Sequence, residues 1–329
     1  MNTAGKIRVG IAGSAGYTGG ELIRLLLLHP HAEIVFAHSK SNAGKFLYEV
    51  HADLRGETNL QFSGTMREDV DVLFLCLGHG ESKQFLDENK ISPHTRLIDL
   101  SQDFRLPSST AQSHGFVYGL PELNKDKIKS AVKVANPGCF ATCIQLALLP
   151  LAAQRLLKTD VHVSATTGST GAGQALSPTI HFSWRHSNLS AYKTFTHQHL
   201  PEIIHSLRQL QPDYSAELNF IPHRGSFTRG IFATAYTEVD RPFTEIRKMY
   251  ADFYAGSPFV FLSDTPVDLK QVINTNKCFL YLEQHGSRLL IISIIDNLLK
   301  GASGQAVQNM NLMCGLEETC GLKLKAVAF

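Results

Sequence analysis

Long apolar runs and blocks of like charge are both absent from this sequence of 329 residues. The longest leucine run, Leu25 to Leu28, is far shorter than the roughly 18 apolar residues that a membrane span needs. Lys and Arg number 31 against 29 Asp and Glu, and this formal net charge of +2 gives no electrostatic footprint for nucleic acid. The opening MNTAGKIRVGIAG has no hydrophobic signal region. We therefore expect a cytoplasmic protein with neither a membrane nor a nucleic acid as partner.

Cysteine is also scarce. Six Cys in a chain of this length cannot form the disulfide framework of a small secreted domain, so each is interpreted as a core residue, a metal ligand or a nucleophile. Hydrophobic residues at 43% and charged residues at 18% exclude a disordered chain. The length suits about two domains.

The first third of the chain alternates between strand and helix patterns. Helices are predicted at 17–28 and 81–89. Strands are predicted at 6–12, 33–39, 70–77 and 95–101. The run VDVLFLCL is continuously apolar, which is typical of a parallel strand buried on both faces. The alternation predicts a doubly wound, Rossmann-type α/β sheet.

The pattern changes after about residue 158. Helices become fewer, 243–254 being the clearest, and 297–316 is expected to be helical despite two glycines. Strands are predicted at 161–168, 216–223, 230–239, 277–284 and 288–296. They favour an α+β domain with an antiparallel or mixed sheet. We therefore predict a nucleotide domain over 1–138, joined by a C-terminal helix within 300–329, and a second domain over 139–299.

A glycine-rich turn joins the first predicted strand to the first predicted helix. Gly13, Gly16 and Gly19 form a GxxGxxG spacing, with Ser14, Tyr17 and Thr18 between them. Such glycines let the backbone approach a pyrophosphate, which the helix N-terminus then binds. The other interpretation is a strand–helix turn without a ligand. We favour a dinucleotide and assign these six residues to its site.

The end of the second predicted strand indicates which dinucleotide binds. NAD-preferring folds usually carry Asp or Glu there to hold the ribose 2′-hydroxyl. Here the run is His38-Ser39-Lys40-Ser41, in which hydroxyls and a cation suit a 2′-phosphate. NADP(H) is therefore expected, with Ser39 and Lys40 in its site, although Lys40 alone is also compatible with an ordinary surface lysine.

The segment VANPGCFATCIQLALLP predicts a helix that begins at or just after Cys139. Its apolar stripe includes Phe140 and Cys143 and continues with a 3.6-residue period. A helix N-terminus favours the thiolate, which makes Cys139 a candidate nucleophile; the alternative is a small buried residue at a tight turn. A thiol beside a nicotinamide suits reduction of an acyl group through a thioester.

Histidines and arginines of the second half supply the remaining candidates. His197 and His199 share one face if their segment is extended, and they suit acid–base catalysis, a metal site or a structural role. We assign no metal, because no third ligand stands out. His223 and Arg229 lie in a turn-rich cationic run, and Arg105 follows a strand end where ligands bind in such folds. Each arginine is equally compatible with an ordinary surface ion pair.

Several motifs in order resemble the N-acetyl-γ-glutamyl-phosphate reductase family, which is related to aspartate-semialdehyde dehydrogenase. They cover almost the whole chain: GSAGYTGGEL, DLSQDFRL, YGLPEL, NPGCFAT, FTHQHLPEI, PHRGSFTRG and DNLLKGASGQAVQN. The resemblance implies reduction of an N-acylglutamyl 5-phosphate to the semialdehyde with NADPH in arginine biosynthesis. It also implies a second domain like that of glyceraldehyde-3-phosphate dehydrogenase (GAPDH-like) and a homo-oligomer, a tetramer or a dimer.

The same resemblance assigns roles to residues. It implies Cys139 as nucleophile, His197 as acid and base, and Asn297 near the nicotinamide. The predicted cofactor site also includes Ser101 and the small-residue loop at Gly168 and Gly171. The predicted substrate-binding residues are Arg105, His199, His223 and Arg229.

Three positions depart from the family pattern. Gly78 stands in place of a usual Pro, Cys143 in place of Gly or Ala, and Gln198 in place of a common Arg. The nearest alternative is an aspartyl- or aminoadipyl-phosphate reductase. A sugar epimerase is disfavoured, because no tyrosine is followed by Lys four residues later. An NADP-sensing regulatory protein and a zinc hydrolase using His197 and His199 are further alternatives.

Overall fold

The computed structural model describes residues 5–78, 80–106 and 115–327. The chain divides into two compact units. The first consists of Met1–Pro137 and Ala302–Lys323, and the second of Gly138–Gly301 and Leu324–Phe329. In the described part of the chain, no helix is long and apolar enough to cross a membrane.

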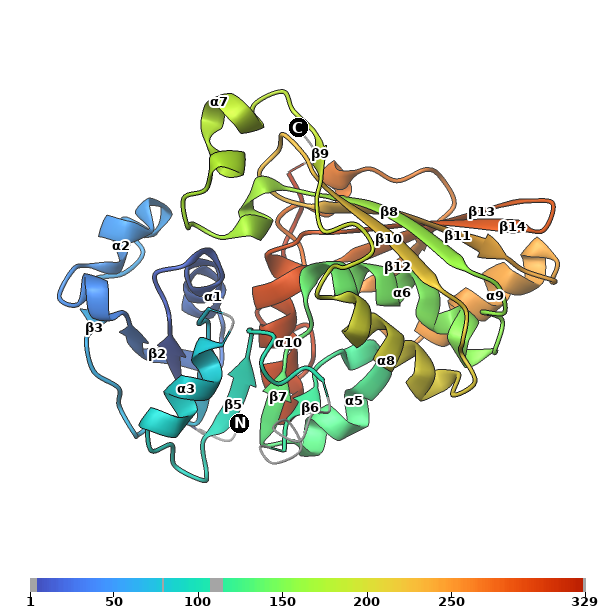
Figure 1. The fold of residues 1–329 in the computed structure, drawn as a ribbon. Helices are drawn as coiled ribbons and strands as arrows, with labels where there is room; N and C mark the ends of the chain where they lie inside the picture. The colour runs from blue at the N-terminus through green and yellow to red at the C-terminus, as the bar shows by residue number, and fades with distance from the viewer. Residues whose placement is uncertain (1–4, 79, 107–114, 328–329) are drawn as a thin grey trace. The chain divides into compact units, whose positions relative to one another are not determined.

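The described residues of the first unit form a parallel sheet of seven strands in the order β3-β2-β1-β4-β5-β7-β6 (Figure 1). The strands are β1 (Ile7–Ala12), β2 (Ala32–His38), β3 (Phe62–Ser63), β4 (Val72–Leu75), β5 (Arg96–Asp99), β6 (Val117–Tyr118) and β7 (Lys133–Ala135). Every residue of β4 is buried, as its apolar run predicts. The strand order reverses between β1 and β4, where such sheets bind ligands. The predicted Rossmann-type sheet is confirmed.

Helices of the first unit come from both halves of the chain. Among the described residues they are α1 (Tyr17–Leu27), α2 (Leu47–Val50), α3 (Glu81–Glu88), α5 (Pro121–Ser130) and α10 (Gly304–Met313). Helix α10 is buried along its whole length and contacts α1, α5 and β5. Its Asn309 donates to the Gly119 carbonyl at 2.9 Å and to Asn136 Oδ1 at 3.0 Å.

The second unit contains a mixed sheet of seven strands among its described residues, in the order β12-β13-β14-β11-β8-β10-β9. The strands are β8 (Val161–Thr167), β9 (Ser190–Ala191), β10 (Leu218–Arg224), β11 (Ile231–Glu238), β12 (Val260–Ser263), β13 (Cys278–His285) and β14 (Arg288–Ile295). The pairs β8–β10 and β12–β13 are parallel and the other pairs antiparallel. The predicted mixed sheet is confirmed.

The helices of the second half of the chain differ from the sequence prediction in three places. Those of the second unit are α6 (Cys139–Ala153), α7 (Phe182–Arg185), α8 (Leu200–Leu210) and α9 (Phe243–Tyr254). Helix α7 was not predicted, because its four residues are too few to show a helical period. Helix α8 was not predicted, because the preceding turn and Pro201 obscure its start. The predicted helix 297–316 is a π-helical turn, η6 (Leu299–Ser303), followed by α10.

Candidate active site

Cys139 is the first residue of α6 and is half-buried. Gly138 occupies the N-cap position, and no side chain in the described structure caps this end of the helix. The Gly138 N–H instead donates to Glu202 Oε2 at 3.4 Å. Unsatisfied N–H groups and the positive end of the helix dipole stabilise a thiolate at such a position. The fold thus places the predicted nucleophile at a helix N-terminus.

The rest of α6 is more buried than the sequence predicts. An apolar stripe predicts one exposed face, yet every residue from Phe140 to Ala152 is buried. The helix contacts β11, β13, β14 and α8. Cys143 lies in this core, with its Sγ 3.3 Å from Ser293 Oγ. Because core packing fixes α6 on all sides, Cys139 has a rigid support.

His197 lies beside this helix start. Its ring is 3% exposed and meets the rings of Phe140 and Phe220 edge-on, each at a centroid distance of 5.4 Å. Its Nδ1 accepts the His199 N–H at 3.2 Å, which assigns the proton of the neutral ring to Nε2. Burial, together with the charges of Lys193 and Arg224, lowers the pKa of His197 to about 4.

Two side chains that the sequence analysis missed, Tyr192 and Arg224, lie near His197. Arg224 stacks its guanidinium 4.5 Å from the centre of the Tyr192 ring and also hydrogen-bonds that side chain. Burial, then the nearby Cys139 thiolate, raises the pKa of Tyr192 to about 12. Tyr192 lies 5.8 Å from His197, between centroids. Both residues flank predicted site residues in the sequence, but their spacing there gives no periodic signal.

The two histidines meet although their segment is not extended. Residues 193–199 form turns that lead into α8, so the alternation argument does not apply. The rings of His197 and His199 are nonetheless 4.6 Å apart between centroids. His199 Nε2 lies 3.8 Å from Glu202 Oε1, and both side chains are buried. The predicted substrate residue His223 is half-buried on β10, where it pairs with Thr166 of β8.

Asn297 joins two loops of the second unit. Its Oδ1 accepts the Gly230 N–H at 2.7 Å, and its Nδ2 donates to Thr170 Oγ1 at 3.0 Å. Gly168 is packed tightly, since a Cβ there would lie 2.4 Å from the Thr228 carbonyl oxygen. Gly171 is exposed. Gly168, Gly171 and Asn297, predicted to lie near the nicotinamide, are therefore neighbours.

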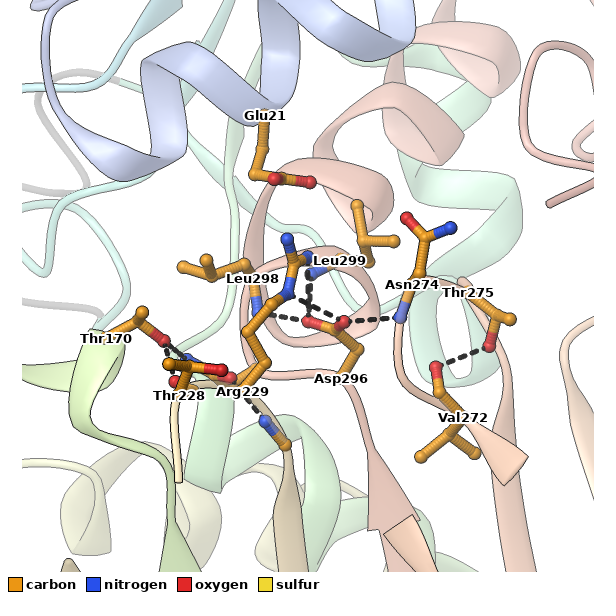
Figure 2. A network of polar contacts seen from close by, with 12 residues as sticks. Glu21, Thr170, Thr228, Arg229, Val272, Asn274, Thr275, Asp296, Leu298 and Leu299 are labelled. Carbon is orange, nitrogen blue, oxygen red and sulfur yellow. Dashed lines mark hydrogen bonds and ion pairs between the residues drawn. The ribbon is translucent and has the colours of Figure 1, made fainter. Parts of the chain in front are cut away.

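Arg229 and Arg105 both have partners within the protein. Arg229 donates from Nε and Nη2 to the two carboxylate oxygens of buried Asp296, at 3.0 and 3.2 Å (Figure 2). In the first unit, Arg105 donates from Nε to the Asn136 carbonyl and from Nη2 to the Leu100 carbonyl, each at 2.9 Å. These bonds hold loops together at positions predicted to bind substrate anions.

Two positions of the glycine turn require glycine for structural reasons. Gly13 has a φ of +76°, and a Cβ at Gly19 would lie 2.6 Å from the Ser14 backbone, so both positions require glycine. Gly16 differs, since a Cβ there would meet only the Gly13 carbonyl at 3.9 Å. The space at Gly16, at the N-terminus of α1, suits a phosphate.

The other predicted residues of the turn vary in exposure. Ser14 is buried and donates to the His38 carbonyl at 3.0 Å. Tyr17 is exposed at the start of α1, and the neighbouring Thr18 hydroxyl bonds the Cys76 thiol. His51, which the sequence analysis missed, bonds the Ser14 carbonyl at 2.8 Å and supports the turn.

Polar side chains cluster at the carboxyl end of β2. Asn42 Nδ2 lies 3.3 Å from the hydroxyls of both Ser39 and Ser41, and Lys45 Nζ donates to Asn42 Oδ1 at 3.1 Å. Lys40 is exposed between them. Hydroxyl, amide and ammonium donors thus gather where a ribose 2′-substituent is expected.

Ser101 has internal partners instead. Its hydroxyl donates to Asp99 Oδ2 at 2.8 Å and accepts the Asp103 N–H at 3.1 Å. Burial raises the pKa of Asp99 to about 6. Ser101 is 1% exposed, so its hydroxyl shapes the loop after β5.

The three departures from the family pattern have local partners. The Gly78 N–H donates to Glu81 Oε2 at 2.9 Å, a bond that a proline would abolish. Gln198 Oε1 accepts from Lys193 Nζ at 2.9 Å.

Among the residues described, no group of three or more His, Cys, Asp or Glu side chains is arranged to hold a metal.

Two family models match the chain. One, described as the NAD binding domain of semialdehyde dehydrogenase, matches residues 8–131. The other, described as the dimerisation domain of semialdehyde dehydrogenase, matches residues 139–297. Solved aspartate semialdehyde dehydrogenases share the fold. The enzyme II of Vibrio cholerae has a TM-score of 0.72 at 15% identity, covering 95% of this chain and 99% of that one. A probable enzyme of Pseudomonas aeruginosa has a TM-score of 0.72 at 16% identity, covering 94% and 98%.

Curated relatives match over their full length. An N-acetyl-γ-glutamyl-phosphate reductase of Christiangramia forsetii is 58% identical over 323 residues, which are 98% of this chain and 100% of the relative. One of Bacteroides fragilis is 57% identical over 324 residues, with the same coverage. The resemblance found in the sequence motifs is thereby confirmed, and the chain belongs to the N-acetyl-γ-glutamyl-phosphate reductase family of semialdehyde dehydrogenase-type oxidoreductases.

Proposed function

We propose that the chain reduces N-acetyl-γ-glutamyl phosphate, or a related N-acyl form, to the N-acyl-glutamate 5-semialdehyde and phosphate with NADPH, in arginine biosynthesis. The observation that carries this proposal is the 58% identity over the full length of a curated reductase of that name. The position of Cys139 at the start of α6 supports it independently. The first unit would bind the dinucleotide, and the second would hold the substrate.

Cys139 would form the covalent link to substrate. Its thiolate attacks the acyl carbon, the C–O bond to phosphate breaks, and inorganic phosphate leaves with the bonding electrons. The resulting thioester carbon would accept a hydride from NADPH when the dinucleotide is bound. The tetrahedral oxyanion of the thiohemiacetal then collapses, breaks the C–S bond, and releases the aldehyde and the Cys139 thiolate.

His197 would act as the hydrogen-bond and proton donor of this centre. Its low pKa keeps the ring neutral at pH 7, and because Nδ1 accepts the His199 N–H, the ring proton is on Nε2. The Nε2–H would donate to the oxyanion that forms on the substrate, whereas the thiol proton of Cys139 would be lost to solvent before the attack. The bond from the His199 N–H to Nδ1 fixes the ring for this role.

Cations near His197 would bind the anionic groups of the substrate. Lys193 and Arg224 lie close enough to lower the pKa of His197, and guanidinium groups bind carboxylate and phosphate well. His199 is next to His197, and we keep His223, Arg105 and Arg229 as candidate substrate contacts. The internal bonds of both arginines mean that their variants must also be tested for stability.

The dinucleotide would lie on the glycine turn, with its 2′-phosphate at Ser39 and Lys40. The polar cluster at the end of β2 supports NADP(H) over NAD(H). Gly168, Gly171 and Asn297 would lie near the nicotinamide, and Ser101 would shape its loop. We also propose a cytoplasmic homo-oligomer, a dimer or a tetramer.

The test compares the wild-type chain with a Cys139→Ser variant. Both are assayed in the reverse direction, as oxidation of a panel of aldehydes. With the wild-type chain, phosphate-dependent NADP reduction is expected with N-acyl-glutamate semialdehydes, and the semialdehyde that is oxidised fastest identifies the acyl group of the substrate. Cys139→Ser should abolish this activity while NADPH still quenches or shifts protein fluorescence. Cys320→Ser is the control. Activity confined to aspartate or aminoadipate semialdehyde, or retained by Cys139→Ser, would contradict the proposal.

A further inference from the structure

The segment after β14 is anchored by one buried carboxylate. Asp296 accepts two hydrogen bonds from Arg229 and others from the N–H groups of Asn274, Leu298 and Leu299, at 2.7, 2.8 and 3.2 Å respectively (Figure 2). Asp296 is fully buried. A carboxylate with this many donors holds the chain that follows it in a fixed position.

The anchored chain then makes a π-helical turn. Residues Leu299–Ser303 form this turn, and the Gly301 N–H donates to the Asp296 carbonyl, five residues earlier, at 2.9 Å. Single π-turns are uncommon and frequently lie at functional sites, because the wider turn displaces one residue from the α-helical path. Gly301 lies in the middle of this turn and donates its five-residue bond.

Gly301 lies directly against the nucleophile. A Cβ added to it would be 2.8 Å from Cys139 Cβ and 3.2 Å from Cys139 Cα. Neither neighbour can yield, since Cys139 begins the buried helix α6 and the turn is held by Asp296. The missing side chain therefore sets how closely the turn approaches the first residue of α6.

We propose that Gly301 is a positioning residue for Cys139: the π-turn is a rigid backbone surface against which the nucleophile rests. This inference rests on the proposed role of Cys139. An added methyl group would push Cys139 away from the turn and from its place at the helix N-terminus. Small displacements of a reacting group can cost on the order of 10²-fold in rate.

The experiment compares Gly301→Ala with Gly256→Ala, in which a Cβ would meet nothing within 4 Å. Gly301→Ala should lower kcat by about 10²-fold with little change in KM, whereas Gly256→Ala should leave both unchanged. Iodoacetamide should alkylate Cys139 more slowly in Gly301→Ala, with the midpoint of its pH profile shifted upward. Wild-type kcat and an unchanged alkylation profile would overturn the inference.

A double-mutant cycle keeps the test valid if Gly301→Ala folds poorly. Cys139→Gly removes the atom that the new methyl group meets, so Gly301→Ala should destabilise the Cys139→Gly background less than the wild type. Equal destabilisation in both backgrounds would overturn the inference. If Cys139→Ser keeps reductase activity, the proposed function itself fails; if only the Gly301 results fail, that function stands.

Discussion

Cys139 differs from the other cysteines in its surroundings. Burial raises the pKa of Cys76 to about 12, that of Cys143 well above its ordinary value, and that of Cys314 and Cys320 to a lesser degree. Cys139 instead is the first residue of a helix. At neutral pH we therefore expect iodoacetamide to label Cys139 first, and loss of activity to follow that labelling. Peptide mapping by mass spectrometry measures both.

His197 gives a prediction about rate. His197→Asn should lower kcat by roughly 10²–10⁴-fold, the usual scale for lost acid–base catalysis. His285→Asn is the control, because His285 is an exposed residue on β13. Steady-state kinetics at pH 7 measure the effect. A His197→Asn enzyme with full kcat would show that the role is wrongly assigned.

The low pKa of His197 also predicts a pH dependence of stability. The folded pKa of about 4 lies below the ordinary 6.5, so the unfolded chain takes up the proton first as pH falls. The contribution of this ring is complete above pH 6.5 and is lost as pH falls toward 4. The difference in unfolding free energy between wild type and His197→Asn should therefore shrink over that range. Urea titrations at several pH values measure it, and a pH-independent difference would contradict the low pKa.

Lys40 tests the choice of cofactor. Lys40→Ala should weaken NADPH binding by roughly tenfold, the scale of one charge-assisted hydrogen bond, and leave NADH binding unchanged. Lys158→Ala, at another exposed lysine, is the control. Fluorescence titrations with both dinucleotides give the two dissociation constants. Equal weakening of NADPH and NADH would reject the 2′-phosphate role.

At the scale of elements, two glycines of the glycine turn should have different roles. We expect Gly19 to be needed for folding and Gly16 for binding of the dinucleotide. Gly16→Ala meets no close protein atom and should cost no more than about 1 kcal/mol as a lost glycine N-cap, yet it should weaken NADPH binding strongly. Gly19→Ala meets the Ser14 backbone and should destabilise the fold by about 1–3 kcal/mol. Thermal unfolding and cofactor titration separate the two. If Gly16→Ala binds NADPH normally, no phosphate lies there.

The elements that could be predicted best from the sequence are those with a strong periodicity of apolar residues. Buried strands such as β4 and the amphipathic α9 follow directly from apolar patterns. Helix α8 and the turn η6 did not, because Pro201 and Gly301 carry no periodic signal. Among site residues, Cys139 is marked by its helix start. Arg224, His51 and the Gly301 contact depend on chain segments that only folding brings together.

For the whole molecule, the order of segments along the chain matters. The first unit is built from residues 1–137 and 302–323, with the second unit between them. Helix α10 packs against α1, α5 and β5 and is buried throughout. A fragment ending at residue 137 should therefore expose apolar surface and bind a hydrophobic dye, whereas the full chain should not.

This arrangement has a consequence for biosynthesis of the polypeptide. The strands of the parallel sheet are synthesised early and α10 late. The first unit therefore remains incomplete while the intervening unit is translated. The buried asparagines of α10, Asn309 and Asn311, reach their partners near Gly119 and His29 only at the end. The need for chaperones should therefore increase as translation of the intervening unit becomes slower.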